Sequence, residues 1–406
     1  MERRDVIVVG GGVSGLAFAW HAARAGRGVL VLEAGERLGG CLDTRRAPPG
    51  FWYELGAHTC YNSYEALLEI IDGSGIAGRI RPRGEARKRF ALLRDGNLLP
   101  MGPVSVFRQF DLWELLRSAP RAFGAKKEGM STYAYYSAVV GKRNYARVLA
   151  PFLSAVPSQS VDAFPAAGAG SLFKKRTRRK DVEKSFTLDG GLGSVVEAMA
   201  ASPRVETRTG AAVREVRRAG ADHEVSLADG GVVAAPVVAL AVPPSMAAAL
   251  LRTEAPELSA ELARIHMAAV ETVGVVLPRG KVAHLPEMAF VVPAEDVFWS
   301  AVTRDPVPDP ERRAFAFHFR TGRTDTEKTR RICDVLGVQP SDFLDVGRRM
   351  TLLPAPVLGH DRTVHELDRL LAGQRLALTG NYFSGLAIED CVLRSRAEWR
   401  RVSTLA

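Results

Sequence analysis

The stretch Asp5-Val-Ile-Val-Val-Gly10-Gly-Gly-Val-Ser-Gly15 decides the fold of this chain. It opens with a β-branched run that is suited to a buried parallel strand. The glycines that follow have the spacing G-x-G-x-x-G, and residues 16–25 continue as a helical pattern without proline. A second apolar run at 28–32 then stops at Glu33. Together these features predict a strand, a helix and a second strand joined by a glycine turn.

The glycine turn has the features of a dinucleotide site. Gly10 permits the tight turn, Gly12 lets a diphosphate approach the backbone, and Gly15 lets helix and strand pack closely. The free N–H groups of the helix N-terminus then face the anion. Glu33 is well placed to accept hydrogen bonds from a ribose diol. The alternative is a glycine-rich structural turn followed by a chance acid.

The residues after Glu33 distinguish FAD from NAD. They read Ala34-Gly-Glu-Arg37-Leu-Gly39-Gly40. This continuation resembles the E-x-x-x-R-x-G-G extension of the FAD-dependent amine oxidase superfamily, which includes protoporphyrinogen oxidases and carotenoid desaturases. The resemblance implies that FAD is the cofactor and that the arginine and the two glycines lie against its diphosphate, where a guanidinium suits phosphate oxygens.

Three further segments resemble the same superfamily. Glu54-Leu-Gly56-Ala57-His58-Thr59 is similar to its E-x-G-P/A loop, which passes near the flavin. Residues 209–216 are similar to the strand whose valine, here Val213, contacts the adenine through its backbone. The segment Gly380-Asn381-Tyr-Phe-Ser-Gly385-Leu386-Ala387-Ile388-Glu389-Asp390-Cys391 most resembles the closing segment of protoporphyrinogen oxidases, in which a helix N-terminus meets the carbonyl edge of the flavin.

The residues that this resemblance places at the cofactor come from all of these segments. They are Gly10, Gly11, Gly12, Val13, Ser14, Gly15, Glu33, Ala34, Arg37, Gly39, Gly40, Gly56, Ala57, His58, Thr59, Val213, Gly380, Asn381, Leu386, Ala387 and Ile388. Two segments depart from protoporphyrinogen oxidases, which usually have Gly-Pro at 56–57 and favour Gly-Ile-Pro at 387–389. The resemblance therefore supports FAD more strongly than it supports a porphyrinogen substrate.

The composition indicates a folded chain with more than one core. It has 406 residues, of which 47% are hydrophobic and 25% charged. The longest apolar run, 234–251, is interrupted by two prolines, so no membrane-spanning helix is expected. The glycine-rich N-terminus lacks an obvious signal-peptide cleavage site, and the four cysteines match neither a zinc pattern nor a disulfide framework. We expect a cytoplasmic protein, with peripheral contact to a membrane left open.

The expected fold class is α/β, with a discontinuous Rossmann-like domain for FAD and a mixed α+β domain for the substrate. The strand and glycine signals assign 1–80, 185–245 and 356–406 to the FAD-binding domain. The intervening stretches, 81–184 and 246–355, are assigned to the substrate-binding domain.

The charge balance favours an anionic partner. The formal net charge is +10, and the run from Lys174 to Lys180 holds six cations in seven residues. This run is interpreted as a solvated loop or as a contact with acidic phospholipids or with substrate carboxylates. A nucleic-acid role is not expected, because no binding module accompanies it.

The catalytic residues are not identified by the sequence. His58 is a weak candidate, because it lies beside the presumed flavin loop and could instead make a structural hydrogen bond. Cys41 and Cys60 are interpreted as small buried thiols, although covalent flavin attachment stays open. His360 and His365 are five residues apart and lie off a common helical face, so no metal pair is expected. Six aromatic residues are interpreted as core or as the lining of an apolar cavity: Phe107, Phe110, Trp113, Tyr133, Tyr135 and Tyr136.

The function expected from these features is that of an FAD-dependent oxidase or dehydrogenase. It would desaturate or oxidise a hydrophobic substrate, as protoporphyrinogen oxidases do. Whether this substrate carries carboxylate groups is left open. The flavin would carry the redox chemistry, and oxygen or a quinone would accept the electrons. Oxidation of an amine or of a secondary metabolite, a redox-neutral flavin-dependent mutase, and a non-catalytic FAD-binding protein are the alternatives.

Overall fold

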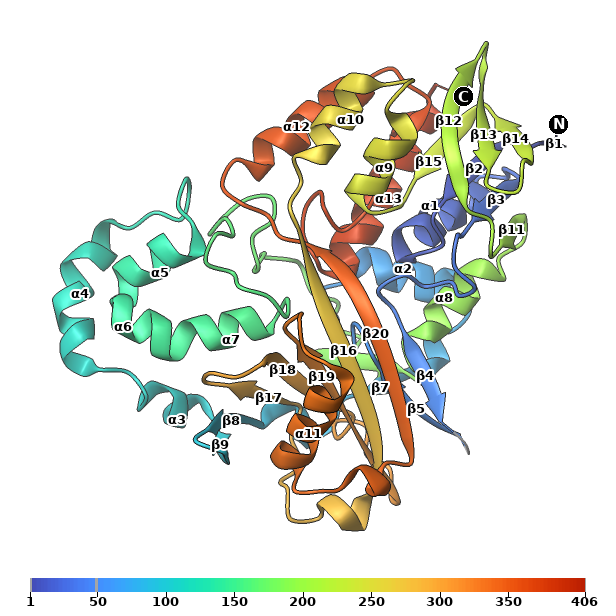
Figure 1. Ribbon diagram of the computed structural model, residues 1–406. Coiled ribbons are helices and arrows are strands. Elements are labelled where there is room, and N and C mark those ends of the chain that lie inside the picture. Colours follow the sequence, from blue (N-terminus) through green and yellow to red (C-terminus); the bar gives the residue numbers. More distant parts are fainter. Residues whose placement is uncertain (1, 48–49, 406) are drawn as a thin grey trace.

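The computed structural model describes residues 2–47 and 50–405 (Figure 1). At its centre is a parallel five-stranded sheet in the order β11-β3-β2-β15-β21. Its strands are β2 (Val6–Val9), β3 (Val29–Leu32), β11 (Val205–Arg208), β15 (Val237–Leu240) and β21 (Leu376–Leu378). Helices cover both faces, which explains why the four strands other than β11 are continuous apolar runs.

Alternate residues of this sheet enter two separate cores. One face packs against α1 (Val13–Arg24), α2 (Glu65–Gly73), α8 (Gly193–Ala200) and α13 (Ile388–Ser403). The other packs against α9 (Pro244–Leu251), α10 (Pro256–Ala263), α12 (His360–Leu371) and a second sheet in the order β1-β14-β13-β12. The strands of that sheet are β1 (Glu2–Arg3), β12 (Val213–Ala219), β13 (Asp222–Leu227) and β14 (Val232–Ala235). The stretch 246–263, assigned from the sequence to the substrate domain, thus lies on the parallel sheet, because its apolar helix faces are buried there.

A seven-stranded sheet forms the second large body, in the order β20-β16-β19-β18-β17-β8-β9. Its strands are β8 (Phe90–Arg94), β9 (Asn97–Met101), β16 (Met267–Pro278), β17 (Phe290–Pro293), β18 (Phe298–Thr303), β19 (Arg312–Phe319) and β20 (Asp345–Pro354). Neighbouring strands are antiparallel except β8 and β17, and α11 (Asp325–Leu336) contributes its apolar side to the core. The two inserted stretches of the sequence therefore do meet in one sheet.

Short strands join the two bodies. The hairpin β4 (Thr44–Ala47) and β5 (Phe51–Glu54) packs under β16, and the hydroxyl of Tyr53 donates to Asp345 Oδ2 at 2.8 Å. A three-stranded sheet, β6-β10-β7, lies beside it. Its strands are β6 (Cys60–Tyr61), β7 (Ile80–Pro82) and β10 (Ser185–Leu188).

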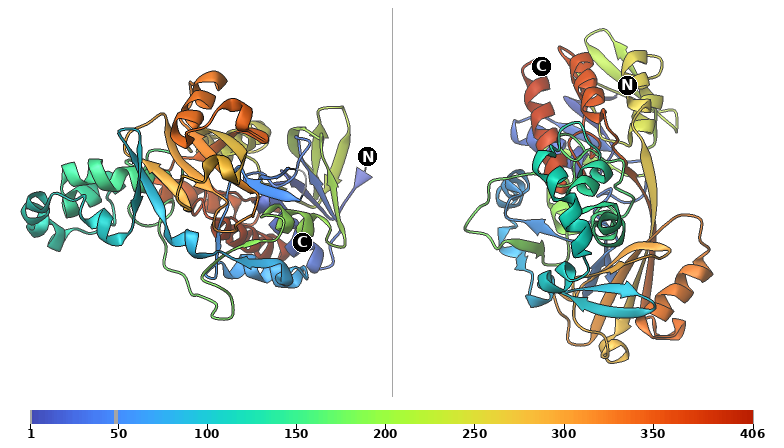
Figure 2. Two further views of the ribbon diagram at one scale, coloured as in Figure 1. Left: turned by 90° about the horizontal axis from the view of Figure 1, so that it is seen from below. Right: turned by 90° about the vertical axis from the view of Figure 1, so that its left-hand side faces the viewer.

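A lobe of short helices projects away from both sheets (Figures 1 and 2). It consists of α3 (Pro103–Phe107), α4 (Leu112–Gly124), α5 (Thr132–Val140), α6 (Lys142–Asn144) and α7 (Ala150–Ala155). Here the interpretation of the aromatic residues as core or cavity lining was wrong for three of them, since Phe107, Trp113 and Tyr133 are 61%, 75% and 41% exposed.

Candidate cofactor and active site

The glycine turn connects β2 to α1 with the close contacts that its spacing predicts. Gly10 has a φ of +105°, and a Cβ there would lie 2.6 Å from the carbonyl oxygen of Ala241. A Cβ on Gly15 would collide with the carbonyl oxygen of Gly10. Gly12 is the N-cap of α1 and has no side chain to cap the helix. The first N–H groups of α1, those of Val13 and Ser14, are therefore left without a side-chain acceptor.

Glu33 follows β3 directly and lies beside this turn. Its Oε2 accepts a hydrogen bond from the Gly11 N–H at 2.8 Å, and its Oε1 accepts one from the Gly35 N–H at 2.8 Å. The Ala211 N–H donates to the Glu33 carbonyl at 2.9 Å, which brings the start of β12 at Val213 towards the same edge. The acid, Ala34 and the predicted adenine-binding strand are thus held together.

The turn from Arg37 to Gly40 lies against the glycine turn. The Gly39 N–H donates to the Gly11 carbonyl at 2.8 Å, and a Cβ on Gly40 would lie 2.9 Å from Gly12 Cα. The Arg37 guanidinium donates to three carbonyls of its own turn, those of residues 38, 40 and 42. In the structure Arg37 therefore shapes the turn, and its contact with a diphosphate stays a prediction.

Asp43 connects this turn to the second body. Its carboxylate is 1% exposed and lies within ion-pair distance of three arginines: Arg37 at 3.6 Å, Arg45 at 3.4 Å and Arg349 at 3.1 Å. Arg349 comes from β20 and also donates to the Gly40 carbonyl at 2.5 Å. The sequence analysis missed Arg349, because no motif surrounds it and only the pairing of distant strands brings it here.

The loop after β5 packs against the residues that follow the turn from Arg37 to Gly40. A Cβ on Gly56 would collide with the Cys41 carbonyl oxygen, and the Ala57 N–H donates to that oxygen at 3.4 Å. The Nδ1 of His58 lies 3.0 Å from the hydroxyl of Thr59, and burial lowers the pKa of His58 to about 3. The imidazole is therefore neutral near pH 7, so the imidazolium form that would act as a general acid is not populated.

The two cysteines near this loop are protonated thiols. Burial is the largest cause that raises the pKa of Cys41 and of Cys60. Because the thiolate is the nucleophile, neither side chain is activated in this environment.

The closing segment leads from β21 to α13. Gly380 and Asn381 follow the strand, and α13 begins at Ile388 after Ala387, which supplies no side-chain cap. The Ser395 hydroxyl donates to the Ser14 carbonyl at 2.8 Å, so α1 and α13 are fixed against each other. Leu386 packs partly against a small core shared with the helical lobe.

The predicted cofactor residues thus gather where parallel strands β2, β3 and β21 end. In open α/β sheets this edge is where ligands bind. The residues fit FAD, because two helices of 12 and 16 residues present uncapped N-termini there and the backbones of two glycine turns touch. When bound, FAD accepts two electrons from the substrate, and this chain binds and orients both.

The basic run at 174–180 is partly structural. Lys174 and Arg176 pair with Asp390 at 3.1 and 2.8 Å, and Arg179 pairs with Asp72 at 2.5 Å and with Asp181. The run therefore ties the start of α13 and the end of α2 to the inserted segment. Three of its cations stay exposed without a side-chain partner among the described residues: Lys175, Arg178 and Lys180.

Comparison with known proteins identifies the family to which this architecture belongs. A family model described as flavin containing amine oxidoreductase matches residues 13–310. The chain belongs to this family. The expected α/β fold, the FAD cofactor and the assignment as an FAD-dependent oxidoreductase are confirmed.

Relatives in the family differ in how much of the chain they match. A coproporphyrinogen III oxidase of Propionibacterium freudenreichii is 24% identical over 96% of this chain and 89% of its own length. The protoporphyrinogen oxidase of Bos taurus is 26% identical over 98% of both. A 15-cis-phytoene desaturase of Narcissus pseudonarcissus is 34% identical, but over only 19% of this chain.

Solved structures share the fold over the whole chain. A putative protoporphyrinogen oxidase from Exiguobacterium superposes with a TM-score of 0.81 at 20% identity, covering 100% of this chain and 99% of that one. Reduced UDP-galactopyranose mutase superposes with a TM-score of 0.74 at 15% identity, covering 99% and 96%. Among the described residues, no helix combines the length and the apolar character that crossing a membrane requires.

Proposed function

We propose that this protein is an FAD-dependent oxidase of porphyrinogens. The observation that carries the proposal is the extent of the matches. The relatives named as porphyrinogen oxidases align along almost the entire chain, whereas the desaturase match is confined to about a fifth of it. The inserted stretches, which build the second sheet, are therefore also shared with the porphyrinogen oxidases.

The chemistry of the site supports this substrate class. Porphyrinogens are electron-rich, so electrons can pass to a flavin without a strong base on the protein. His58 is only a weak base, because burial lowers its pKa to about 3, and Cys41 and Cys60 are protonated thiols. The net charge of +10 also suits a substrate that carries carboxylates. Oxygen or a quinone is the proposed final acceptor.

The proposal is tested by anaerobic titration of the purified yellow protein with coproporphyrinogen, protoporphyrinogen and a panel of amines. We expect the visible flavin absorbance to bleach with a porphyrinogen and to recover when air or a quinone is admitted. Bleaching by an amine alone would replace the porphyrinogen by an amine substrate. A reduced protein that converts a substrate without consuming any acceptor would instead indicate a mutase.

We further propose that peripheral contact with an acidic membrane, if the substrate is delivered there, is made by Lys175, Arg178 and Lys180. These are the cations of the basic run that make no internal ion pair. Binding to vesicles containing an acidic phospholipid should then fall steeply as salt rises, and should weaken when the three residues are changed to Gln. Binding that does not depend on salt would remove this proposal.

A further inference from the structure

A small cavity lies where the cofactor-side strands meet the seven-stranded sheet. Its volume is about 30 Å³, enough for one or two water molecules or for a small polar group. One wall of the cavity is formed by β5, the His58 loop and β10, which lie next to the predicted cofactor site. The opposite wall is formed by β18 and β19 of the seven-stranded sheet and by the loop at 304–307. The chain segment that follows β7 closes it with the side chain of Arg83.

Three groups that donate hydrogen bonds line this cavity and have no partner among the residues that the structure describes. The hydroxyl of Thr187 is buried in a residue that is 2% exposed, and it makes no hydrogen bond. The Nε of Arg304 is likewise buried and unsatisfied. The half-buried guanidinium of Arg83 makes no hydrogen bond or ion pair with any described residue. Native proteins rarely leave such groups unpaired, so each requires an explanation.

Arg304 is held in place by its surroundings. Its guanidinium carbon lies 4.4 Å from the ring centre of Phe51 and 4.5 Å from that of Trp52, and its Nη1 donates to the Val307 carbonyl at 2.7 Å. Contact with two aromatic rings fixes the guanidinium, and its Nε is left without a hydrogen-bond acceptor. The position of this donor is therefore set before any ligand arrives.

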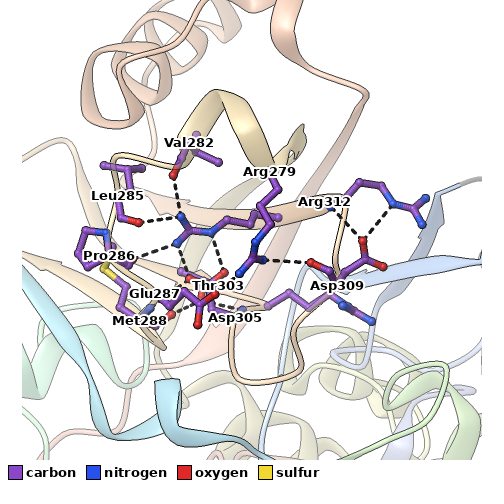
Figure 3. A network of polar contacts seen from close by, with 12 residues as sticks. Arg279, Val282, Leu285, Pro286, Glu287, Met288, Thr303, Asp305, Asp309 and Arg312 are labelled. Atoms are coloured by element: carbon purple, nitrogen blue, oxygen red, sulfur yellow. Dashed lines mark hydrogen bonds and ion pairs between the residues drawn. The ribbon is translucent and has the colours of Figure 1, made fainter.

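A buried ion-pair network fixes the loop that carries Arg304 (Figure 3). Asp305 and Arg313, which are 1% and 3% exposed at their side chains, pair through two hydrogen bonds of 2.9 and 2.5 Å. The Thr303 hydroxyl donates to the Met288 carbonyl, as the close-up shows beside Asp305. The Gly84 N–H donates to the carbonyl of Pro306 at 2.7 Å, which connects the segment carrying Arg83 to the same loop.

The carboxylates of Asp309, Asp189 and Glu54 act electrostatically on Arg304, but none of them accepts a hydrogen bond from its Nε. Both carboxylate oxygens of Glu54 are already occupied, by the Leu192 N–H at 2.7 Å and the Thr44 hydroxyl at 2.8 Å. Burial raises the pKa of Glu54 to about 7, and His58 is neutral. Burial also lowers the pKa of Arg83, because no counter-ion offsets the loss of water. The cavity therefore holds hydrogen-bond donors without acceptors, and Arg83 adds a positive charge that no described carboxylate pairs with.

We propose that this cavity is a carboxylate-binding subsite in which Arg83, Thr187 and Arg304 donate to the two oxygens. A carboxylate accepts several hydrogen bonds at once, and a guanidinium matches its geometry. The assignment of that carboxylate to the substrate rests on the proposed function. A free small carboxylate would use the same chemistry, so the experiment separates the two sources.

The first measurement uses the FAD-loaded protein and acetate as the probe, at constant ionic strength set by a bulky sulfonate. Acetate should raise the thermal midpoint of the wild-type protein in a saturable way, and acetamide, its neutral isostere, should not. Arg83→Gln and Thr187→Val should each weaken acetate binding, Arg83→Gln by about tenfold or more. Arg81→Gln is the matched control, since Arg81 is exposed and pairs only with Asp189. No saturable response in the wild type, or equal responses in all variants, would overturn the subsite.

The second measurement identifies the source of the carboxylate. If the substrate supplies it, acetate competes with a carboxylated porphyrinogen, and Arg83→Gln raises KM for the free acid about tenfold while leaving the methyl ester unchanged. If a free anion supplies it, acetate does not compete, and both KM values are unchanged. Failure to oxidise any porphyrinogen would refute the proposed function, while the acetate response would still decide the subsite.

Discussion

Replacing Gly12 by alanine separates the demands of the cofactor from those of the fold. A Cβ on Gly12 would lie 3.5 Å from Gly40 Cα and 3.9 Å from Gly40 N, which is ordinary contact. The backbone of Gly12, with φ −74° and ψ 176°, is accessible to alanine. The apo protein should therefore change in stability by less than about 1 kcal/mol, because the weaker N-cap and the reduced freedom of the unfolded chain offset each other.

FAD binding should respond very differently. If the diphosphate passes over Gly12, the added methyl group intrudes on a filled contact, which costs about 1–3 kcal/mol, or roughly 5-fold to 150-fold in Kd. Quenching of flavin fluorescence during titration of the apo protein measures this Kd, and urea unfolding of the apo protein measures its stability. Gly15→Ala is the comparison, since its Cβ would collide with the Gly10 carbonyl oxygen and should destabilise the fold itself. An alanine at 12 that binds FAD as tightly as glycine would refute the placement of the diphosphate.

Three other substitutions test separate parts of the structure. Asp305→Ala should lower the free energy of unfolding in urea by about 3–5 kcal/mol, because it leaves the buried charge of Arg313 without a partner. Asp305→Leu combined with Arg313→Met should recover most of that stability, and additive losses from the two single changes would contradict this. Because the pKa of Glu54 is raised from 4.5 to about 7, the wild type should lose up to about 3 kcal/mol of stability as pH rises through that range, whereas Glu54→Gln should not. Arg37→Ala should weaken FAD binding about tenfold, because Arg37 shapes the turn and is predicted to contact the diphosphate, and Gly12→Glu should abolish binding; unchanged binding in Arg37→Ala would refute that contact.

The cofactor half of the fold was predictable because its signals are local. The turn from β2 to α1 needs only the glycine spacing and the flanking apolar periodicity, and both lie within one short stretch of sequence. The structure begins α1 at Val13, inside the glycine motif, instead of at Leu16, because the helix starts at the N-cap Gly12. Which residues touch FAD stays a prediction.

The rest of the site depends on pairing between distant strands. Arg349 reaches Gly40 because β20 pairs with β16, and Arg83 lines the same cavity as Arg304 because Gly84 bonds to the distant Pro306. No periodicity in the sequence reports such registers. Phe107 and Trp113 show an error of composition, since aromatic residues were predicted to be buried and these two side chains are exposed.

The strand order of the parallel sheet has a consequence for synthesis. Strand β2 is made first, but its neighbour β15 and the edge strand β21 are more than 200 residues further along, and α13, which packs on α1, is the last helix. A nascent chain therefore lacks several elements that pack around the glycine turn until residues 237–403 have been synthesised. Such non-local pairing slows folding and lengthens the time during which apolar strands are unprotected. Free FAD and chaperones during translation should accordingly govern the yield of active protein more than the stability of the finished fold does.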